Sequence, residues 1–401
     1  MESKTGNVGF RSIFVIALAA AFIVSGFFAP NNVLAEQSPN ITIITPDGTT
    51  SWRGVQEISW TDVSNSPPYK IFYSSNFSTF QNLISNVSET SFEWDTTGNG
   101  EVVGVTDGTY QIKVENLKGE FNVSNQFIID NTPPTTTIDG IGGTPGNDNW
   151  WVSVPSITLH CEDVLSGCNE TFYRWNGNPD DPNGFSLYEN ESSIVDAPEG
   201  ENVLFFFSTD NARDKEGKNN QEAVKQCNDP DICPDGLIKV DTTFPDIASY
   251  TLNGEGANAF FNPVDGQSVD IFITADEPVE YNRIKILDET LTEVKFFTQT
   301  GVFQTTASKN WDGTGQTGDG EYTLQVNIED MAGNTVDDLD LVPHIIVVDT
   351  TDPSINSFTE PMDDEVYKDS VPVVFKASDL NGITCAYQVN GDDPVDFACN
   401  N

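Results

Sequence analysis

After residue 35, the hydrophobic positions fall in short runs that have the composition and alternation of β-strands. Residues rich in β-branched and aromatic side chains occupy Ile41–Ile44, Lys70–Tyr73, Thr109–Val114 and Tyr322–Ile328. Gly, Asn, Asp and Pro separate such runs at the short distances typical of turns. No stretch of helical length carries apolar residues at a 3.6-residue period. The pattern predicts an all-β chain of antiparallel, immunoglobulin-like sandwiches in a row.

A recurring linker divides this chain into modules. Asp130, Asp241 and Asp349 each follow a β-branched run and precede a Pro, and they lie 111 and 108 residues apart. That spacing is the size of a β-sandwich, and the Pro ends the preceding strand because it cannot donate to a ladder. We therefore expect a signal segment at 1–35 and modules at 36–132, 133–243, 244–351 and 352–401. The last module is about half as long as the others, so we expect it to be incomplete and the chain to be a fragment.

Two kinds of module alternate. Trp94-Asp95 with Asp107-Gly108-Thr109-Tyr110 in module 1 recurs as Trp311-Asp312 with Asp319-Gly320-Glu321-Tyr322 in module 3. We expect the Trp to begin a hairpin, the Asp-Gly to form its turn and the Tyr to open the return strand. Modules 2 and 4 share a different pattern, an Asp, a Gly and a Tyr at similar spacing: Asp163, Gly167, Tyr173 and Asp379, Gly382, Tyr387.

The first 35 residues have the layout of a secretory signal. Lys4 and Arg11 precede the uncharged apolar run 12–29, and Val33-Leu34-Ala35 provides a cleavage site before Glu36. A retained N-terminal anchor is the alternative, because the run is nearly long enough to span a membrane. No second apolar segment of spanning length follows. We expect an extracellular or cell-surface protein that meets the membrane only through this segment or through an anchor beyond residue 401.

Six cysteines form three couples that are close in sequence: Cys161 and Cys168, Cys227 and Cys233, Cys385 and Cys399. Export to an oxidising compartment favours disulfides within each couple. A thiolate metal site is the alternative, but it needs CxxC-like spacing that none of the couples has.

Individual modules resemble known families. Module 1, with Thr45-Pro46-Asp47-Gly48 and Ile58-Ser59-Trp60, resembles the Ig-like domains grouped with the Kre9/Knh cell-wall proteins. Module 2, with Asn149-Trp150-Trp151 and the Asp163 to Gly167 turn, is similar to OmpL47-type Ig-like repeats of prokaryotic surface proteins. Module 3, with Trp311-Asp312-Gly313-Thr314 and Asp330-Met331-Ala332-Gly333-Asn334, resembles FlgD-type and bacterial Ig-like adhesin repeats. These resemblances imply a fold, and Ig-like folds host many unrelated functions.

Composition excludes several functions. The 401 residues contain 62 Asp and Glu against 18 Lys and Arg, for a net charge of −44, so a nucleic-acid partner is not expected. Two histidines, His160 and His344, leave little material for histidine-based catalysis or metal binding. No combination of nucleophile, base and oxyanion donor stands out, so we expect no enzyme within these residues.

The acidic residues at the linkers suggest a cation. Resemblance to tandem adhesin repeats and cadherin-like arrays implies that junction carboxylates can bind Ca²⁺. The candidate ligands are acids in or near the linkers: Asp130, Asp210, Asp241, Asp246, Asp330, Asp349 and Asp352. The alternative is that each linker Asp caps a turn through hydrogen bonds to its own backbone. We expect no other cofactor.

Together these features predict an exported surface protein with a structural or adhesive role and an unidentified protein or glycan partner. The main alternative is that the modules are accessory domains of a larger secreted enzyme, such as a glycoside hydrolase or protease, whose catalytic domain lies beyond residue 401.

Overall fold

The structure is a computed structural model that describes residues 40–99, 102–189 and 193–360, and residues 366–368, 370, 371, 373–380, 382–388 and 392–397. Apart from the short 3₁₀ turns η1 (Pro182–Gly184), η2 (Pro234–Gly236) and η3 (Pro263–Asp265), the regular structure of these residues is β. The all-β prediction is confirmed. Within the described ranges, no helix is long and apolar enough to cross a membrane. The expected signal segment lies outside them.

Module 1 is a sandwich of two sheets. One sheet has the order β1 (Ile41–Thr45), β2 (Val55–Asp62), β5 (Ser91–Asp95); the other joins β4 (Gln81–Val87), β3 (Tyr69–Ser74), β6 (Gly108–Glu115), β7 (Phe121–Val123) and β8 (Phe127–Ile129). Alternate residues of the facing strands are buried between the sheets, among them Trp60, Ile71 and Ile112. The period-2 pattern of the sequence thus specifies which face of each strand is buried.

Module 2 is divided among three sheets. They are β9 (Thr135–Gly142) with β11 (Ser156–Glu162); β10 (Trp150–Trp151) with β18 (Ile238–Val240) and β14 (Gly200–Asn202); and β13 (Ser186–Tyr188), β12 (Cys168–Trp175), β15 (Leu204–Arg213), β16 (Asn219–Gln221) and β17 (Lys225–Gln226). The disulfides Cys161–Cys168 and Cys227–Cys233 are both present, as predicted. Cys385 is also disulfide-bonded, whereas Cys399 lies outside the described residues.

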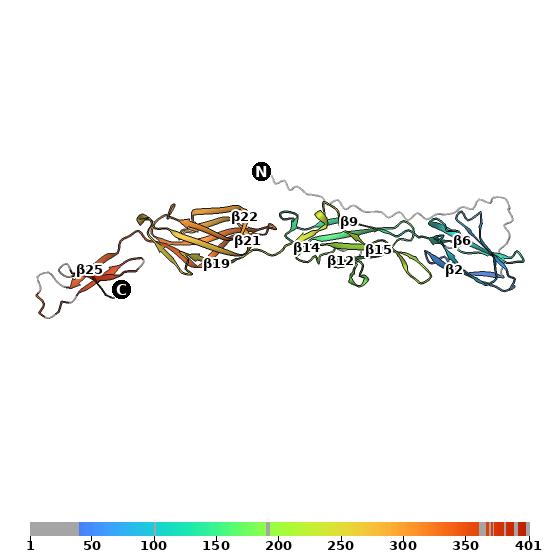
Figure 1. Cartoon of the computed structure of the whole chain (residues 1–401), viewed down its shortest axis with the longest axis horizontal. Helices are drawn as coiled ribbons and strands as arrows, with labels where there is room; N and C mark the ends of the chain where they lie inside the picture. The colour runs from blue at the N-terminus through green and yellow to red at the C-terminus, as the bar shows by residue number, and fades with distance from the viewer. Residues whose placement is uncertain are drawn as a thin grey trace, which may run out of the picture.

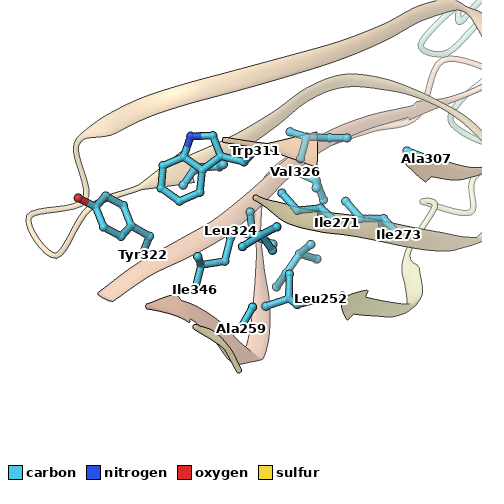
Figure 2. Close-up of a cluster of buried hydrophobic side chains, with 14 of the residues drawn as sticks. Leu252, Ala259, Ile271, Ile273, Ala307, Trp311, Tyr322, Leu324, Val326 and Ile346 are labelled. Atoms are coloured by element: carbon cyan, nitrogen blue, oxygen red, sulfur yellow. The ribbon is translucent and has the colours of Figure 1, made fainter. Parts of the chain in front are cut away.

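Module 3 contains the longest strands. Its sheet joins β19 (Ile247–Leu252), β20 (Ala259–Phe261), β21 (Val269–Leu287), β22 (Glu293–Trp311), β23 (Gly320–Asp330) and β24 (Thr335–Val348). β21 pairs with β19 along its first part and with β23 along its second, so one strand serves both layers. Figure 2 shows Trp311 and Tyr322 together at one end of the buried cluster, their ring centroids 5.2 Å apart.

Four short strands are described in module 4: β25 (Ser354–Glu360) pairs with β26 (Val374–Ser378), and β27 (Cys385–Tyr387) pairs with β28 (Val395–Phe397). The modules follow one another end to end along the long axis of the molecule (Figure 1). The last strands of modules 1, 2 and 3 end at Ile129, Val240 and Val348, one residue before each linker Asp.

The expected hairpin after the Trp-Asp pairs is wrong. β5 pairs with β2 while β6 pairs with β3, and in module 3 β22 and β23 both pair with β21 rather than with each other. Each connecting loop thus joins strands that are not paired with each other, and the return tyrosine is held by a backbone carbonyl upstream of it. Tyr110 donates its hydroxyl proton to Thr106 O at 2.6 Å, and Tyr322 donates to Gly318 O at 2.7 Å. This is the tyrosine-corner geometry of immunoglobulin-like sandwiches.

Candidate functional site

All three linkers form the same turn. The Oδ1 atom of the linker Asp accepts a hydrogen bond from the backbone N–H of the Thr two residues later: Thr132 at 3.2 Å, Thr243 at 3.1 Å and Thr351 at 3.2 Å. This is the turn-capping alternative raised from the sequence, and it is present in every linker. It uses only one of the two oxygens of each carboxylate.

Each linker is also held by the preceding module. Asp107 accepts from Asn131 N at 2.8 Å, and Asp319 accepts from Thr350 N at 2.9 Å. At the second linker, Glu199 accepts from Thr242 N at 3.1 Å. Asp107 and Asp319 are the acids of the repeated Asp-Gly pairs, so that motif fixes the linker rather than forming a hairpin turn.

Backbone hydrogen bonds also join consecutive modules directly. Arg53 N donates to Arg213 O at 3.0 Å, and Arg213 N donates to Ser51 O at 3.0 Å, which joins modules 1 and 2. At the next junction Asn147 N donates to Ala332 O at 2.7 Å. Because these contacts are between backbones, they fix how one module meets the next.

Three carboxylates meet at the junction of modules 1 and 2, which we call cluster 1: Asp130, Asp163 and Asp210. One oxygen from each lies within 4.8 Å of the others. Asp130 is 1 % exposed and Asp210 is 0 % exposed. Asp210 projects from β15, and Asp163 lies in the β11–β12 turn that the Cys161–Cys168 disulfide closes.

A second group, cluster 2, occupies the junction of modules 2 and 3: Asp241, Glu277 and Asp330, again with oxygens within 4.8 Å. Asp330 is the last residue of β23 and is 0 % exposed, and Glu277 lies within β21. The eight ion pairs found among the described side chains include none of the six acids of the two clusters.

Like charges and burial disfavour ionisation in both clusters. In cluster 1, burial raises the pKa of Asp210 from 3.8 to about 6. The charge of Asp130 adds to this shift, and the hydrogen bond from Asn220 opposes it. In cluster 2, burial followed by the charges of Asp330 and Asp241 raises the pKa of Glu277. Burial also raises the pKa of Asp241, and the charge of Asp330 adds to the shift. The hydrogen bond from Thr243 acts in the opposite direction.

An asparagine at each cluster ties the linker to the buried Asp. Asn220 Nδ2 donates to Asp130 O at 2.8 Å and to Asp210 Oδ2 at 2.7 Å. Asn334 Nδ2 makes the same two bonds, to Asp241 O at 3.1 Å and Asp330 Oδ2 at 2.8 Å. Asn220 lies ten residues after Asp210, and Asn334 lies four residues after Asp330. The same pair of hydrogen bonds therefore recurs at both clusters although the loops differ in length.

The sequence candidates divide accordingly. Asp130, Asp210, Asp241 and Asp330 are brought into clusters, although Asp210 and Asp330 lie on strands rather than in the loops expected for them. Asp349 is 8 % exposed. Burial and neighbouring Asp379 raise its pKa, whereas the hydrogen bond from Thr351 lowers it.

Like Asp349, the other two candidates lie outside the clusters, so three of the seven do. Asp246 caps the start of β19, where it accepts from Ile247 N, and Asp352 is exposed. Sequence reasoning missed two ligand candidates. Asp163 had been noted only as a turn residue, and Glu277 gave no signal because it lies in the middle of a strand.

Comparison with known proteins finds similarity at the level of fold. No protein-family model matches the chain, and no curated protein does. Among solved structures, it is similar to a tetra-tandem repeat from the extending region of a large adhesion protein, with 12 % identity, 85 % of this chain and 87 % of that chain covered and a TM-score of 0.25.

Two further solved structures give similar values. The extracellular domains 3–5 of Drosophila OTK share 10 % identity over 78 % of this chain and 98 % of theirs, with a TM-score of 0.22. The fibronectin(III)-like modules of Clostridium thermocellum CbhA share 15 % identity over 53 % of this chain and 93 % of theirs, with a TM-score of 0.20. The neighbours are Ig-like and fibronectin-III-like repeats. The finer Kre9/Knh, OmpL47 and FlgD resemblances remain predictions.

Proposed function

We propose that this chain is the stalk of an exported surface protein, which holds a distal element away from the cell or meets a protein or glycan partner along its sandwich faces. The observation that carries the proposal is the attachment of every linker to the preceding module and of the first two linkers to the following module as well. The Thr side of the linker is bonded to the preceding module, and at the first two linkers the Asp lies in a cluster of the following module.

Short, doubly attached linkers favour a stiff rod over a flexible string. Five residues separate the end of β8 at Ile129 from the start of β9 at Thr135, and the other two linkers are similarly short. Flexible linkers of Gly and Ser would instead let the modules move independently. The disulfides and the N-terminal signal pattern support an extracellular location.

Small-angle X-ray scattering of the full chain tests the stalk. A compact globule of this size has a radius of gyration of about 21 Å. Modules built of strands of 8 to 19 residues are roughly 40 Å long, so four in line make a rod of about 160 Å, with a radius of gyration of about 46 Å. A value close to that of the globule would refute the proposal.

A further inference from the structure

The two clusters hold more negative charge than buried protein groups tolerate without a counter-charge. Each gathers three carboxylates within 4.8 Å, and no described Lys or Arg pairs with them. Isolated buried charges are destabilising unless they are paired or coordinate a metal. In cluster 2 a cation at the centre would also satisfy the second oxygen of Asp241, which the turn hydrogen bond leaves unused.

A separate observation in cluster 2 indicates a missing electropositive partner. Asn334 is 2 % exposed, and its Oδ1 atom has no hydrogen-bond donor. The amide group that carries this oxygen points into the cluster, because its Nδ2 atom bonds Asp330 Oδ2 and the carbonyl of Asp241. A buried amide oxygen without a partner is costly, and amide oxygens are ordinary ligands of hard cations.

The chemistry of the donors selects the ion. Both groups consist of carboxylates alone, without His or Cys, which excludes the usual ligand sets of zinc and copper. Ca²⁺ accepts six to eight oxygens in irregular geometry, whereas Mg²⁺ requires a near-ideal octahedron.

We infer that cluster 2 is a Ca²⁺ site, formed by the linker residue Asp241 and two carboxylates of the following module. Its ligands are Asp241, Glu277 and Asp330, with the Asn334 amide beside them. Occupancy ties the linker to the module after it, where hydrogen bonds already tie it to the module before. The inference does not depend on the proposed stalk function.

Isothermal titration of the metal-stripped full chain with CaCl₂ tests the site. The matched variant is Glu277→Gln, which keeps the shape of the side chain and removes one charge from cluster 2. The control is Asp246→Asn, an acid at the same junction as cluster 2 but outside it. We expect Glu277→Gln to bind one ion fewer than wild type and the control to bind the same number as wild type. MgCl₂ is titrated in parallel and should bind at least about tenfold more weakly.

Thermal unfolding of the same proteins without metal separates a metal site from a structural role. Removing one of three like charges should leave the melting temperature equal to or above that of wild type, while the rise on adding Ca²⁺ is lost at that junction. Three results would overturn the inference: no Ca²⁺ bound at about 5 mM, which exceeds the Kd of roughly 1 mM of the weakest extracellular modules, unchanged stoichiometry in Glu277→Gln, or a metal-free Glu277→Gln that melts below wild type. Equal affinity for Mg²⁺ would overturn the choice of ion.

Discussion

Replacing Gly146 by Ala should loosen the junction of modules 2 and 3 while leaving the cores of both modules folded. Gly146 lies in the β9–β10 loop of module 2, and a Cβ atom there would be 2.1 Å from the carbonyl oxygen of Ala332 in module 3. Its backbone is not in the left-handed region, so the substitution introduces no conformational strain of its own. The added atom would also lie 2.7 Å from Cγ1 of Val152 in its own module, but the only backbone it meets belongs to the next module.

The size of the effect follows from the geometry. A carbon and an oxygen atom at 2.1 Å must separate by about 1 Å, and one of the two modules has to move. That movement lengthens the neighbouring bond from Asn147 N to Ala332 O, which is 2.7 Å long. Such a bond contributes roughly 0.5–1.5 kcal/mol, so the Asn147 amide proton should exchange with solvent about 2- to 10-fold faster.

Hydrogen exchange measured residue by residue in the full chain is the assay. Gly256→Ala is the control, because a Cβ atom at this glycine of module 3 meets nothing closer than 3.8 Å and its backbone is also outside the left-handed region. We expect Gly256→Ala to leave Asn147 protected and Gly146→Ala to expose it while both module cores stay protected. Unchanged protection of Asn147 in Gly146→Ala would show that the modules do not meet as described.

Three further predictions concern single modules. Glu222→Ala should cost module 2 about 2–5 kcal/mol, seen as faster exchange at two buried amides, because the carboxylate accepts from the backbone N–H of Thr136 and Ser208. Tyr322→Phe should destabilise module 3 by about 1 kcal/mol in urea unfolding, through loss of the hydroxyl bond to Gly318 O, and an unaltered transition would contradict the tyrosine corner. Burial alone would raise the pKa of Asp62, but hydrogen bonds from neighbouring Ser and Asn groups outweigh it and lower the pKa from 3.8 to about 2. Since the folded value is the lower one, Asp62→Asn should cost about 1 kcal/mol above pH 4 and almost nothing near pH 2, as measured by urea unfolding of module 1 across that range.

Much of the architecture was predictable because it depends on local patterns. The alternation in β23, where Tyr322, Leu324 and Val326 are all buried, can be read directly from the sequence. The linker boundaries follow from Pro, which cannot continue a strand. The order of strands within sheets could not be predicted, since pairing partners are distant in sequence. The mistaken hairpin shows this: Trp94 and Tyr110 lie close in sequence, but their strands belong to different sheets.

The clusters were half predictable for a similar reason. A linker Asp is visible because it recurs at a fixed spacing, and Asp330 is visible because it follows a strand and begins a turn. Glu277 is one of many acids in the chain, and only the fold places it beside Asp241. With 62 acidic residues, composition cannot indicate which three share a pocket. The hydrogen bonds of the Asn residues would also have been missed, because the two lie at different distances from their Asp.

Ions can act on this chain in two ways: by screening the exposed acids along the modules, or by binding at the buried acids of the junctions. Most of the acids are exposed, and ordinary salt screens the repulsion among exposed charges at separations beyond about 8–10 Å. Asp130, Asp210 and Asp330 are at most 1 % exposed, and their oxygens are within 4.8 Å of other carboxylates, a range at which mobile ions of the solvent screen little. Monovalent salt can therefore relieve repulsion along the surface of the modules but not at the first two junctions. There the repulsion is removed only by a proton or by a bound cation, and it lies at the points where one module is joined to the next.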